Sequence, residues 1–268
     1  MTWILLIVIT LLPALGWFFL WRIQDQEREP WKAMTTCFVL GMLAPLMVFG
    51  LGYMFPGVFT LERSLWTIFC LALLEEVVKG LLLIVGIEIH EQWFTQIVDG
   101  LIYGSTIGLG FAFVENILYL IDFVTVDMSF VVVYLVRSLN TMLAHSLFVA
   151  FFGFFYASAY LRKEIFPEKK REKPWHHFFL NLWESLPLHV TMFHLLPNRP
   201  SKRGHYPGSL IFEGILLASL LHFIFNGLFE WEFYGMNWSF LTVPFVAMMG
   251  YGVWRMFLHE VYVRMVGK

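Results

Sequence analysis

The sequence is poor in charge and in cysteine. Only 14% of its 268 residues are charged, whereas 59% are hydrophobic. A soluble domain has about 25% charged and roughly 45–50% apolar residues, so the composition excludes an ordinary soluble domain. The two cysteines, Cys37 and Cys70, lie in apolar stretches and do not suggest a disulfide framework. A net charge of −2 provides no basic excess, and we expect no nucleic-acid partner.

Long apolar stretches dominate the chain instead. Each has about 20 residues or more, which is enough to cross roughly 30 Å of hydrocarbon as an α-helix. Because backbone polar groups in lipid must be satisfied within the segment, these stretches predict helices. We therefore predict an all-α polytopic bundle in a lipid bilayer, with residues 1–268 forming one membrane domain. The expected spans are Thr2–Trp21, Ala33–Phe55, Ser64–Ile87, Gln96–Ile121, Ser129–Leu161, Gly208–Phe229 and Phe240–Val261.

Basic residues are nearly absent from one side of this predicted bundle. Most of the 18 Lys and Arg residues fall in the first connection, in the connection 162–207 and in the C-terminal segment. Basic connections remain in the cytoplasm, so we expect the C-terminus to be cytoplasmic and the N-terminus outside. Within 162–207, the aromatic segment Trp175–Leu196 is expected to lie along the membrane interface.

Ionisable residues occur inside the spans, where they are costly and are by default functional. The third span contains Glu75, Glu76 and Lys79. At spacings of three and four residues on a helix, the lysine can reach either carboxylate. Two adjacent carboxylates in a low dielectric are not both readily ionised, so one is expected to be held charged and the other to protonate more easily. Such a pair is suited to general acid–base chemistry.

Further polar residues lie in three other spans. In the fourth span a stripe of small residues (Gly100, Gly104, Gly108 and Ala112) predicts close approach of a neighbouring helix and ends beside Glu115. Counted along each span, most of the polar set falls at compatible depths in the outer half of the membrane. We therefore expect one water-accessible site that opens outward. Its further candidate members are Asn116, Arg137, Asn140, His145, His222 and Asn226.

The common hydrolase motifs are missing. There is no Gly-x-Ser-x-Gly elbow, no Gly-x-Gly-Asp and no His-Glu-x-x-His. Water is then the expected nucleophile, activated by a glutamate, with His or Asn polarising the scissile carbonyl. Alternatively, Glu76, His145 and His222 could hold Zn²⁺ with an open position for water. The residues alone do not separate these two forms of peptide hydrolysis.

Two other classes of function use the same residues. A proton-coupled transporter could employ the carboxylates as relays, but it predicts inverted repeats and interrupted spans, and the sequence shows neither. A non-catalytic scaffold would tolerate damaged motifs, whereas each motif position here carries a chemically competent residue.

The chain resembles the PrsW family of bacterial intramembrane proteases, distant relatives of the CAAX-processing and bacteriocin-processing membrane proteases. The resemblance rests on motifs that recur in order over nearly the whole chain, while the connection 162–207 is longer than is usual in the family. These motifs are Gln24-Asp25-x-Glu27-x-Glu29-Pro30, Glu75-Glu76-x-x-Lys79, Asp99-Gly100-x-x-Tyr103-Gly104, Gly108-x-Gly110-Phe111-x-x-x-Glu115-Asn116-x-x-Tyr119, His145 with Gly153-Phe154-x-Tyr156, and His222.

The resemblance implies an endopeptidase of the bacterial cell (inner) membrane. It would cut a single-span membrane protein, such as an anti-sigma factor at its site 1, near the extracytoplasmic face. Glu75 and Glu76 would activate water, and Glu115 stands where the CAAX-processing relatives have a catalytic His. His145 and His222, with Asn226, would polarise the carbonyl or bind metal; Lys79, Arg137, Asn116 and Asn140 would support them. Those relatives favour a glutamate-activated water without a cofactor, with zinc as the alternative.

Overall fold

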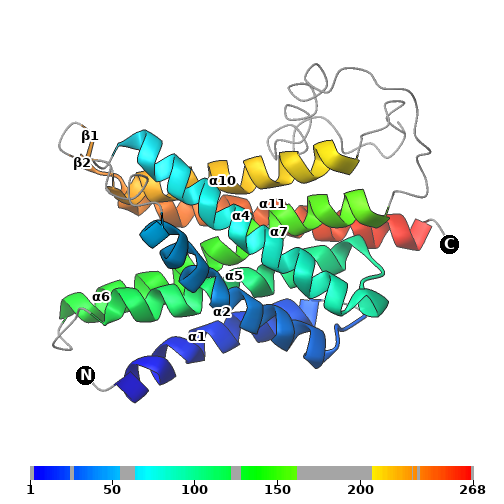
Figure 1. The fold of residues 1–268 in the computed structure, drawn as a ribbon, viewed down its shortest axis with the longest axis horizontal. Helices are drawn as coiled ribbons and strands as arrows, with labels where there is room; N and C mark the ends of the chain where they lie inside the picture. The colour runs from blue at the N-terminus through cyan, green and yellow to red at the C-terminus, as the bar shows by residue number, and fades with distance from the viewer. Residues whose placement is uncertain are drawn as a thin grey trace.

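The computed structural model describes residues 3–24, 27–54, 64–121, 128–161, 207–230, 232–233 and 236–266. These residues form a bundle of long helices whose two chain ends lie at opposite ends of the bundle (Figure 1). The main helices are α1 (Trp3–Gln24), α2 (Trp31–Met54), α4 (Leu65–Ile89), α5 (Ile97–Leu120), α6 (Met128–Val136), α7 (Met142–Leu161), α10 (Pro207–Glu230) and α11 (Thr242–Val266).

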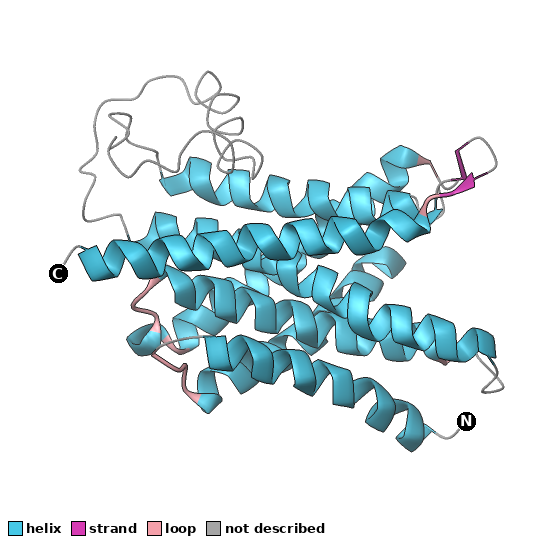
Figure 2. Ribbon diagram, turned by 180° about the vertical axis from the view of Figure 1, so that it is seen from behind, coloured by secondary structure: helices cyan, strands magenta, loops and turns pink. Residues whose placement is uncertain are grey.

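Short elements complete the described chain. They are the 3-10 turns η1 (Glu91–Trp93) and η3 (Ser239–Leu241), the π-helical turn η2 (Arg137–Thr141), and the two-residue strands β1 (Glu232–Phe233) and β2 (Met236–Asn237). The two strands pair antiparallel at one end of the bundle. Figure 2 shows that helix accounts for nearly all of the described chain. The prediction of an all-α bundle is confirmed.

The helices have the length and composition of membrane spans. Six helical segments are long and apolar enough to cross a membrane, and one of them is the composite α6–η2–α7. Helix α4 equals them in length with 25 residues but carries Glu75, Glu76 and Lys79. Large apolar side chains such as Ile4, Tyr53 and Trp66 are exposed on the outside of the bundle, as expected where lipid is the solvent. The protein is therefore a multi-pass membrane protein.

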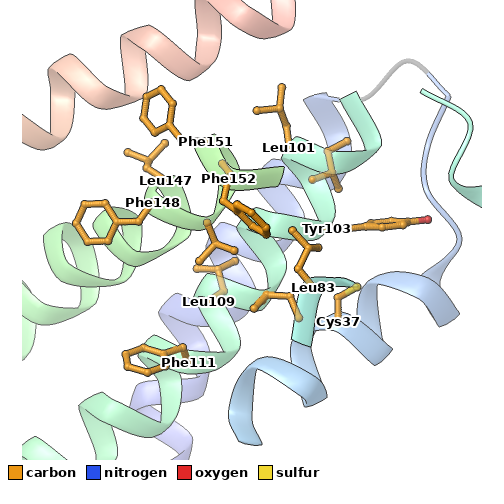
Figure 3. Packing of buried hydrophobic residues seen from close by; sticks show 14 of the residues in the cluster. Cys37, Leu83, Leu101, Tyr103, Leu109, Phe111, Leu147, Phe148, Phe151 and Phe152 are labelled. Atoms are coloured by element: carbon orange, nitrogen blue, oxygen red, sulfur yellow. The ribbon is translucent and has the colours of Figure 1, made fainter. Parts of the chain in front are cut away.

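Helix α5 forms the centre of the bundle. It is buried over most of its length and packs mainly on α7, α2 and α1, while α10 packs on α7 and α4. Figure 3 shows part of the apolar core around α5 and α7, which includes Leu101, Leu109, Phe148 and Phe152. This core fixes the relative positions of the helices that carry the polar residues.

The contact between α5 and α7 depends on the predicted stripe of small residues. A Cβ atom on Gly104 would lie 2.3 Å from the carbonyl oxygen of Val149, and one on Gly108 would lie 2.2 Å from that of His145. Gly100 and Gly153 approach each other in the same way. The predicted close approach is confirmed, and it places the backbone of His145 directly against α5.

Two of the sequence motifs meet at the end of the bundle opposite β1 and β2. The Tyr103 hydroxyl donates a hydrogen bond to Glu29, and the Gln96 amide donates one to Glu27. Asp99 is buried and accepts hydrogen bonds from the backbone N–H groups of Thr95 and Gln96, so it caps α5. These contacts fasten the connection between α1 and α2 to the start of α5.

The fifth span is confirmed as one helical segment over Ser129–Leu161. Within it the π-helical turn η2 joins α6 to α7, which the sequence analysis did not predict. No glycine or proline occurs in residues 128–141, so the sequence carries no local signal for this turn.

Two predictions lie outside what the fold can test. The connection 162–206, with the expected interfacial segment Trp175–Leu196, lies outside the described residues. The opposite placement of the chain ends agrees with an odd number of spans, but the sidedness of the bundle stays a prediction from charge.

The α5–α7 contact yields a stability prediction. Gly104→Ala is expected to lower the free energy of unfolding by about 1–3 kcal/mol, because the added methyl group meets the backbone of Val149. Gly16→Ala is the matched control, since Gly16 is exposed on α1 with nothing within 4 Å of its would-be Cβ. The measurement is thermal unfolding of the purified protein in detergent, and equal stability of the two variants would contradict the close approach.

Candidate active site in the membrane interior

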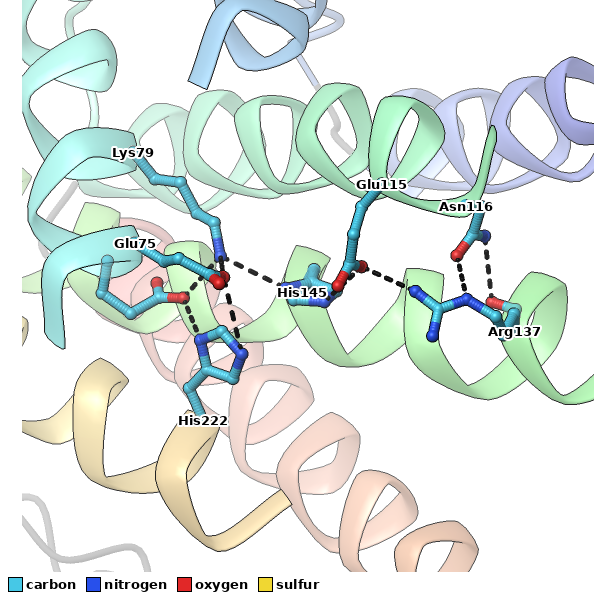
Figure 4. A network of polar contacts seen from close by, with 8 residues as sticks. Glu75, Lys79, Glu115, Asn116, Arg137, His145 and His222 are labelled. Atoms are coloured by element: carbon cyan, nitrogen blue, oxygen red, sulfur yellow. Dashed lines mark hydrogen bonds and ion pairs between the residues drawn. The ribbon is translucent and has the colours of Figure 1, made fainter. Parts of the chain in front are cut away.

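Polar side chains from five segments of the chain converge inside the bundle (Figure 4). Helix α4 supplies two glutamates and a lysine, α5 a glutamate and an asparagine, and η2, α7 and α10 one residue each. The members of this polar network are Glu75, Glu76, Lys79, Glu115, Asn116, Arg137, His145 and His222. The structure thus brings these eight predicted residues together, whereas the site itself stays a prediction.

Lys79 lies at the centre of the network. Its side chain is fully buried, and its Nζ lies 2.7 Å from Glu76 Oε1, 3.5 Å from Glu75 Oε2 and 3.2 Å from His145 Nδ1. The ammonium also lies 3.6 Å from the ring centre of Phe111, a favourable cation–π contact. As the spacing predicted, the lysine reaches both carboxylates, and it is closer to Glu76.

His222 joins the two glutamates from α10. Its Nδ1 lies 2.8 Å from Glu76 Oε1, and its Nε2 lies 3.7 Å from Glu75 Oε2. The ring stacks on Phe148, with 4.9 Å between ring centres and 17° between planes. The same oxygen of buried Glu76 thus receives contacts from Lys79 and His222. Glu75 is held at longer distances and its side chain is 19% exposed, so it retains capacity to bind water.

His145 connects this group to a second carboxylate. Its Nδ1 faces Lys79, and because an ammonium can only donate hydrogen bonds, Nδ1 acts as the acceptor. The ring proton is then on Nε2, which lies 3.1 Å from Glu115 Oε2. Arg137 Nη2 lies 2.9 Å from the same Glu115 oxygen. The small-residue stripe of α5 therefore brings Glu115 to a partner span, as predicted.

Three of these residues could hold a metal ion. Ligand atoms of Glu75, His145 and His222 all lie within 4.8 Å of one another. Two imidazoles and one carboxylate are a common donor set for Zn²⁺. Glu76 and Glu115 contact the histidines through one ring nitrogen each, as carboxylates that orient metal-bound histidines do. The donor set therefore fits zinc.

This metal set differs from the one that the sequence suggested. Glu76 was expected beside His145 and His222, but its Oε1 is engaged by Lys79 and by His222 Nδ1. The geometry groups Glu75 with the histidines instead. Lys79 Nζ lies close to both His145 Nδ1 and Glu75 Oε2, so a positive charge already stands beside two of the three donors.

The predicted supporting residues have different positions. Asn116 contacts Arg137, whose Nε donates to Asn116 Oδ1 at 2.8 Å. Asn140 faces away from the network, and its Nδ2 donates to the Thr242 hydroxyl at 2.9 Å. Asn226 is half-buried on α10 and makes no hydrogen bond or ion pair to the network within the described part of the chain.

The sequence did not reveal the aromatic side chains around the network. Phe111, Phe148 and Tyr119 contact Lys79, His222 and Arg137 respectively. Phe111 and Tyr119 stand within the motif around Glu115, but spacing alone did not indicate that their ring faces meet a cation. Aromatic rings supply apolar surroundings that strengthen electrostatic interactions within the site.

The network lies towards the end of the bundle away from the C-terminus. Glu75 is about 15 Å from the start of α4 and His222 about 12 Å from the end of α10, at 1.5 Å per residue. Both of these helix ends lie at the end that carries β1 and β2 (Figure 1). The most exposed carboxylate of the network is Glu115, whose side chain is 34% exposed.

Comparison with known proteins finds a matching family. The family model described as "PrsW family intramembrane metalloprotease" matches residues 29–192, which include the polar residues on α4, α5, η2 and α7. Helix α10, with His222, lies beyond the matched region. No solved structure matches the chain.

Several curated proteins named "Protease PrsW" are similar. That of Oceanobacillus iheyensis is 31% identical over 148 residues, which cover 55% of this chain and 66% of that protein. That of Bacillus subtilis is 31% identical over 163 residues, 60% of this chain and 68% of that protein. That of Geobacillus kaustophilus is 28% identical over 158 residues, 59% of this chain and 65% of that protein. The matches thus span about two thirds of the relatives' length.

A family match over more than half of the chain, together with this buried Glu, His and Lys network on membrane helices, identifies the protein: it belongs to the PrsW family of intramembrane metalloproteases.

Proposed function

We propose that the protein is an intramembrane endopeptidase that hydrolyses a peptide bond of a single-span membrane protein. One observation carries the proposal: Glu75, partly exposed, lies beside two buried imidazoles and a buried ammonium in the interior of a membrane bundle. Such groups are costly in hydrocarbon and mark functional sites. The relatives are named as proteases, and the site contains the acid–base groups that peptide hydrolysis requires.

Water is the proposed nucleophile, and Glu75 is the proposed base. Of the two glutamates at the site on α4, Glu75 is the one proposed to accept a hydrogen bond from water, because Glu76 Oε1 is engaged by Lys79 and His222. As the scissile carbonyl oxygen gains negative charge, the fixed positive charges of Lys79 and Arg137 stabilise it in surroundings of low dielectric. The proton taken from water is then available to the departing amine.

A metal-free site is the version we favour. Lys79 Nζ lies 3.2 Å from His145 Nδ1 and 3.5 Å from Glu75 Oε2, and this charge opposes a divalent ion between the same atoms. The alternative is zinc held by Glu75, His145 and His222, which the donor set and the family description support. Zinc bound there would act as a Lewis acid and make a bound water easier to deprotonate. Glu76 and Glu115 would orient the two histidines.

The proposed cut lies near the extracytoplasmic face of the bacterial inner membrane. The network is closer to the bundle end that the charge distribution assigns to the outside. An anti-sigma factor with one span, cut at site 1, is the proposed class of substrate, as the family resemblance implies. Proton-coupled transport through the same carboxylates is the competing function, and it predicts ion flux without peptide cleavage.

The first test measures cleavage directly. In proteoliposomes with a single-span substrate, Glu75→Gln and His222→Gln are each expected to lower kcat at least about 100-fold, because each removes an acid–base group. His259→Gln is the control, since His259 is exposed on α11 and lies outside the network. Mass spectrometry of the products locates the cut bond. Full cleavage by both network variants would rule out this site, and proton flux without cleavage by the wild type would favour transport.

The second test concerns metal. Purified active protein is expected to contain no stoichiometric zinc and to keep its activity in a chelator, since Glu75 is the base and Lys79 the cation. Metal content by mass spectrometry and cleavage after chelation provide separate readouts. One zinc ion per chain that disappears in His222→Gln, together with activity that zinc restores, would establish the zinc-dependent version instead.

The third test concerns the charge of Lys79. Lys79→Met is expected to lower the free energy of unfolding by about 3–5 kcal/mol, because it leaves the buried carboxylate of Glu76 without its cation. Glu76→Gln in the same chain should recover part of this loss. A double-mutant cycle of thermal unfolding in detergent measures the coupling, and strictly additive losses would show that the pair is not coupled.

A further inference from the structure

The π-helical turn η2 lies at the point where the fifth span enters the polar network. The Met142 N–H bonds the carbonyl of Arg137, five residues earlier, instead of that of Ser138, four residues earlier. A single turn of this kind accommodates one extra residue and is frequent at functional sites. Its effect is to change the rotation of α6 and Arg137 relative to α7 and His145.

This rotation determines which groups reach Glu115. Arg137 and His145 are eight residues apart, and in an uninterrupted α-helix they would point about 80° away from each other. With one extra residue absorbed in η2, the eight residues advance the helix by about as much as seven, which leaves roughly 20° between the two directions. Arg137 Nη2 and His145 Nε2 accordingly lie 2.9 Å and 3.1 Å from the same Glu115 oxygen (Figure 4).

Neighbouring helices hold this turn in place. Because the Met142 N–H is used elsewhere, the Ser138 carbonyl needs another donor, and Trp17 Nε1 on α1 supplies it at 3.2 Å. Asn116 Nδ2 on α5 lies 3.4 Å from the Arg137 carbonyl. Asn140 is tied to Thr242 on α11. An unsatisfied carbonyl in the membrane interior costs several kcal/mol, so these partners favour η2 over other turns.

We infer that η2 is the device that aligns Arg137 and His145 on Glu115, and that Trp17 and Asn116 are positioning residues that hold it. Glu115 in turn holds the His145 proton on Nε2 and leaves Nδ1 to face Lys79. The inference rests on the proposed function for its effect on cleavage, whereas the alignment of His145 can be measured without any substrate. Trp17 reaches η2 through a hydrogen bond to the backbone carbonyl of Ser138.

Deletion of Leu139 tests the alignment. Leu139 is 58% exposed and lies inside η2, so removing it takes away the extra residue while Leu139→Ala keeps the residue count. In the full chain with nitrogen-15-labelled histidine, His145 is assigned by comparison with His145→Gln, and NMR reports which ring nitrogen carries the proton. We expect the Nε2–H form in the wild type and in Leu139→Ala, and its loss in the deletion. Cleavage should fall about 100-fold through kcat in the deletion alone.

Trp17→Phe covers the case in which the deletion does not fold. It keeps an aromatic ring but replaces the indole by a smaller phenyl ring without the N–H group, so we expect kcat to fall about tenfold with KM unchanged, together with a mixed His145 signal. Trp254→Phe is the matched control, because Trp254 lines the same groove between α1, α7 and α11 as Trp17.

A folded deletion variant with the wild-type His145 signal and activity would overturn the inference. So would equal behaviour of Trp17→Phe and Trp254→Phe. A wild type with the expected signal but no cleavage would refute the proposed function and leave the alignment standing.

Discussion

The buried ammonium of Lys79 is the constraint to which the rest of the bundle is adapted. A positive charge with no exposed surface in a membrane is tolerated only with close partners, and Lys79 has acceptors from α4 and α7 and the face of Phe111. Glu76 comes from its own helix, so this ion pair forms wherever α4 is helical. His145 must be brought by another helix, and His222 reaches Glu76 from a third. The contacts that stabilise this buried lysine therefore constrain the depth and rotation of α7 and α10 against α4.

Close approach of α5 and α7 makes the second half of the network possible. The backbones touch at Gly104 and Gly108. Glu115 follows about two helical turns after Gly108 on α5 and lies within reach of His145. Partly satisfied buried networks are costly, and here Glu76, Lys79, His145 and Arg137 all have charged or hydrogen-bonding neighbours. Glu75 is the member held most loosely, with longer contacts and some exposure. Glu75 thus differs from the other members of the network in having both longer contacts and partial exposure.

The motif residues at the other end of the bundle have a structural role. Glu29 is buried beside Tyr103, and its carboxylate accepts the phenol hydrogen bond that burial of a charge requires. This contact, with that of Gln96 and Glu27, attaches the α1–α2 connection to the start of α5. It lies well away from the polar network, so these motif residues are accounted for by the anchoring of α5, whose other end carries Glu115.

The sequence by itself determined the class of the protein, its spans and the local groupings of its polar residues. The reach of Lys79 to Glu75 and Glu76, and the small-residue face ending at Glu115, follow from regular helix geometry, which depends only on spacing. The tertiary structure decided what depends on rotation and contact between helices. It showed that Glu75 rather than Glu76 is grouped with the histidines, that Asn140 contacts Thr242, and that the fifth span contains the π-helical turn η2. Residue spacing does not predict these outcomes, because the hydrogen-bond partners that stabilise them, the donor Trp17 and the acceptor Thr242, come from segments more than 100 residues away in the chain.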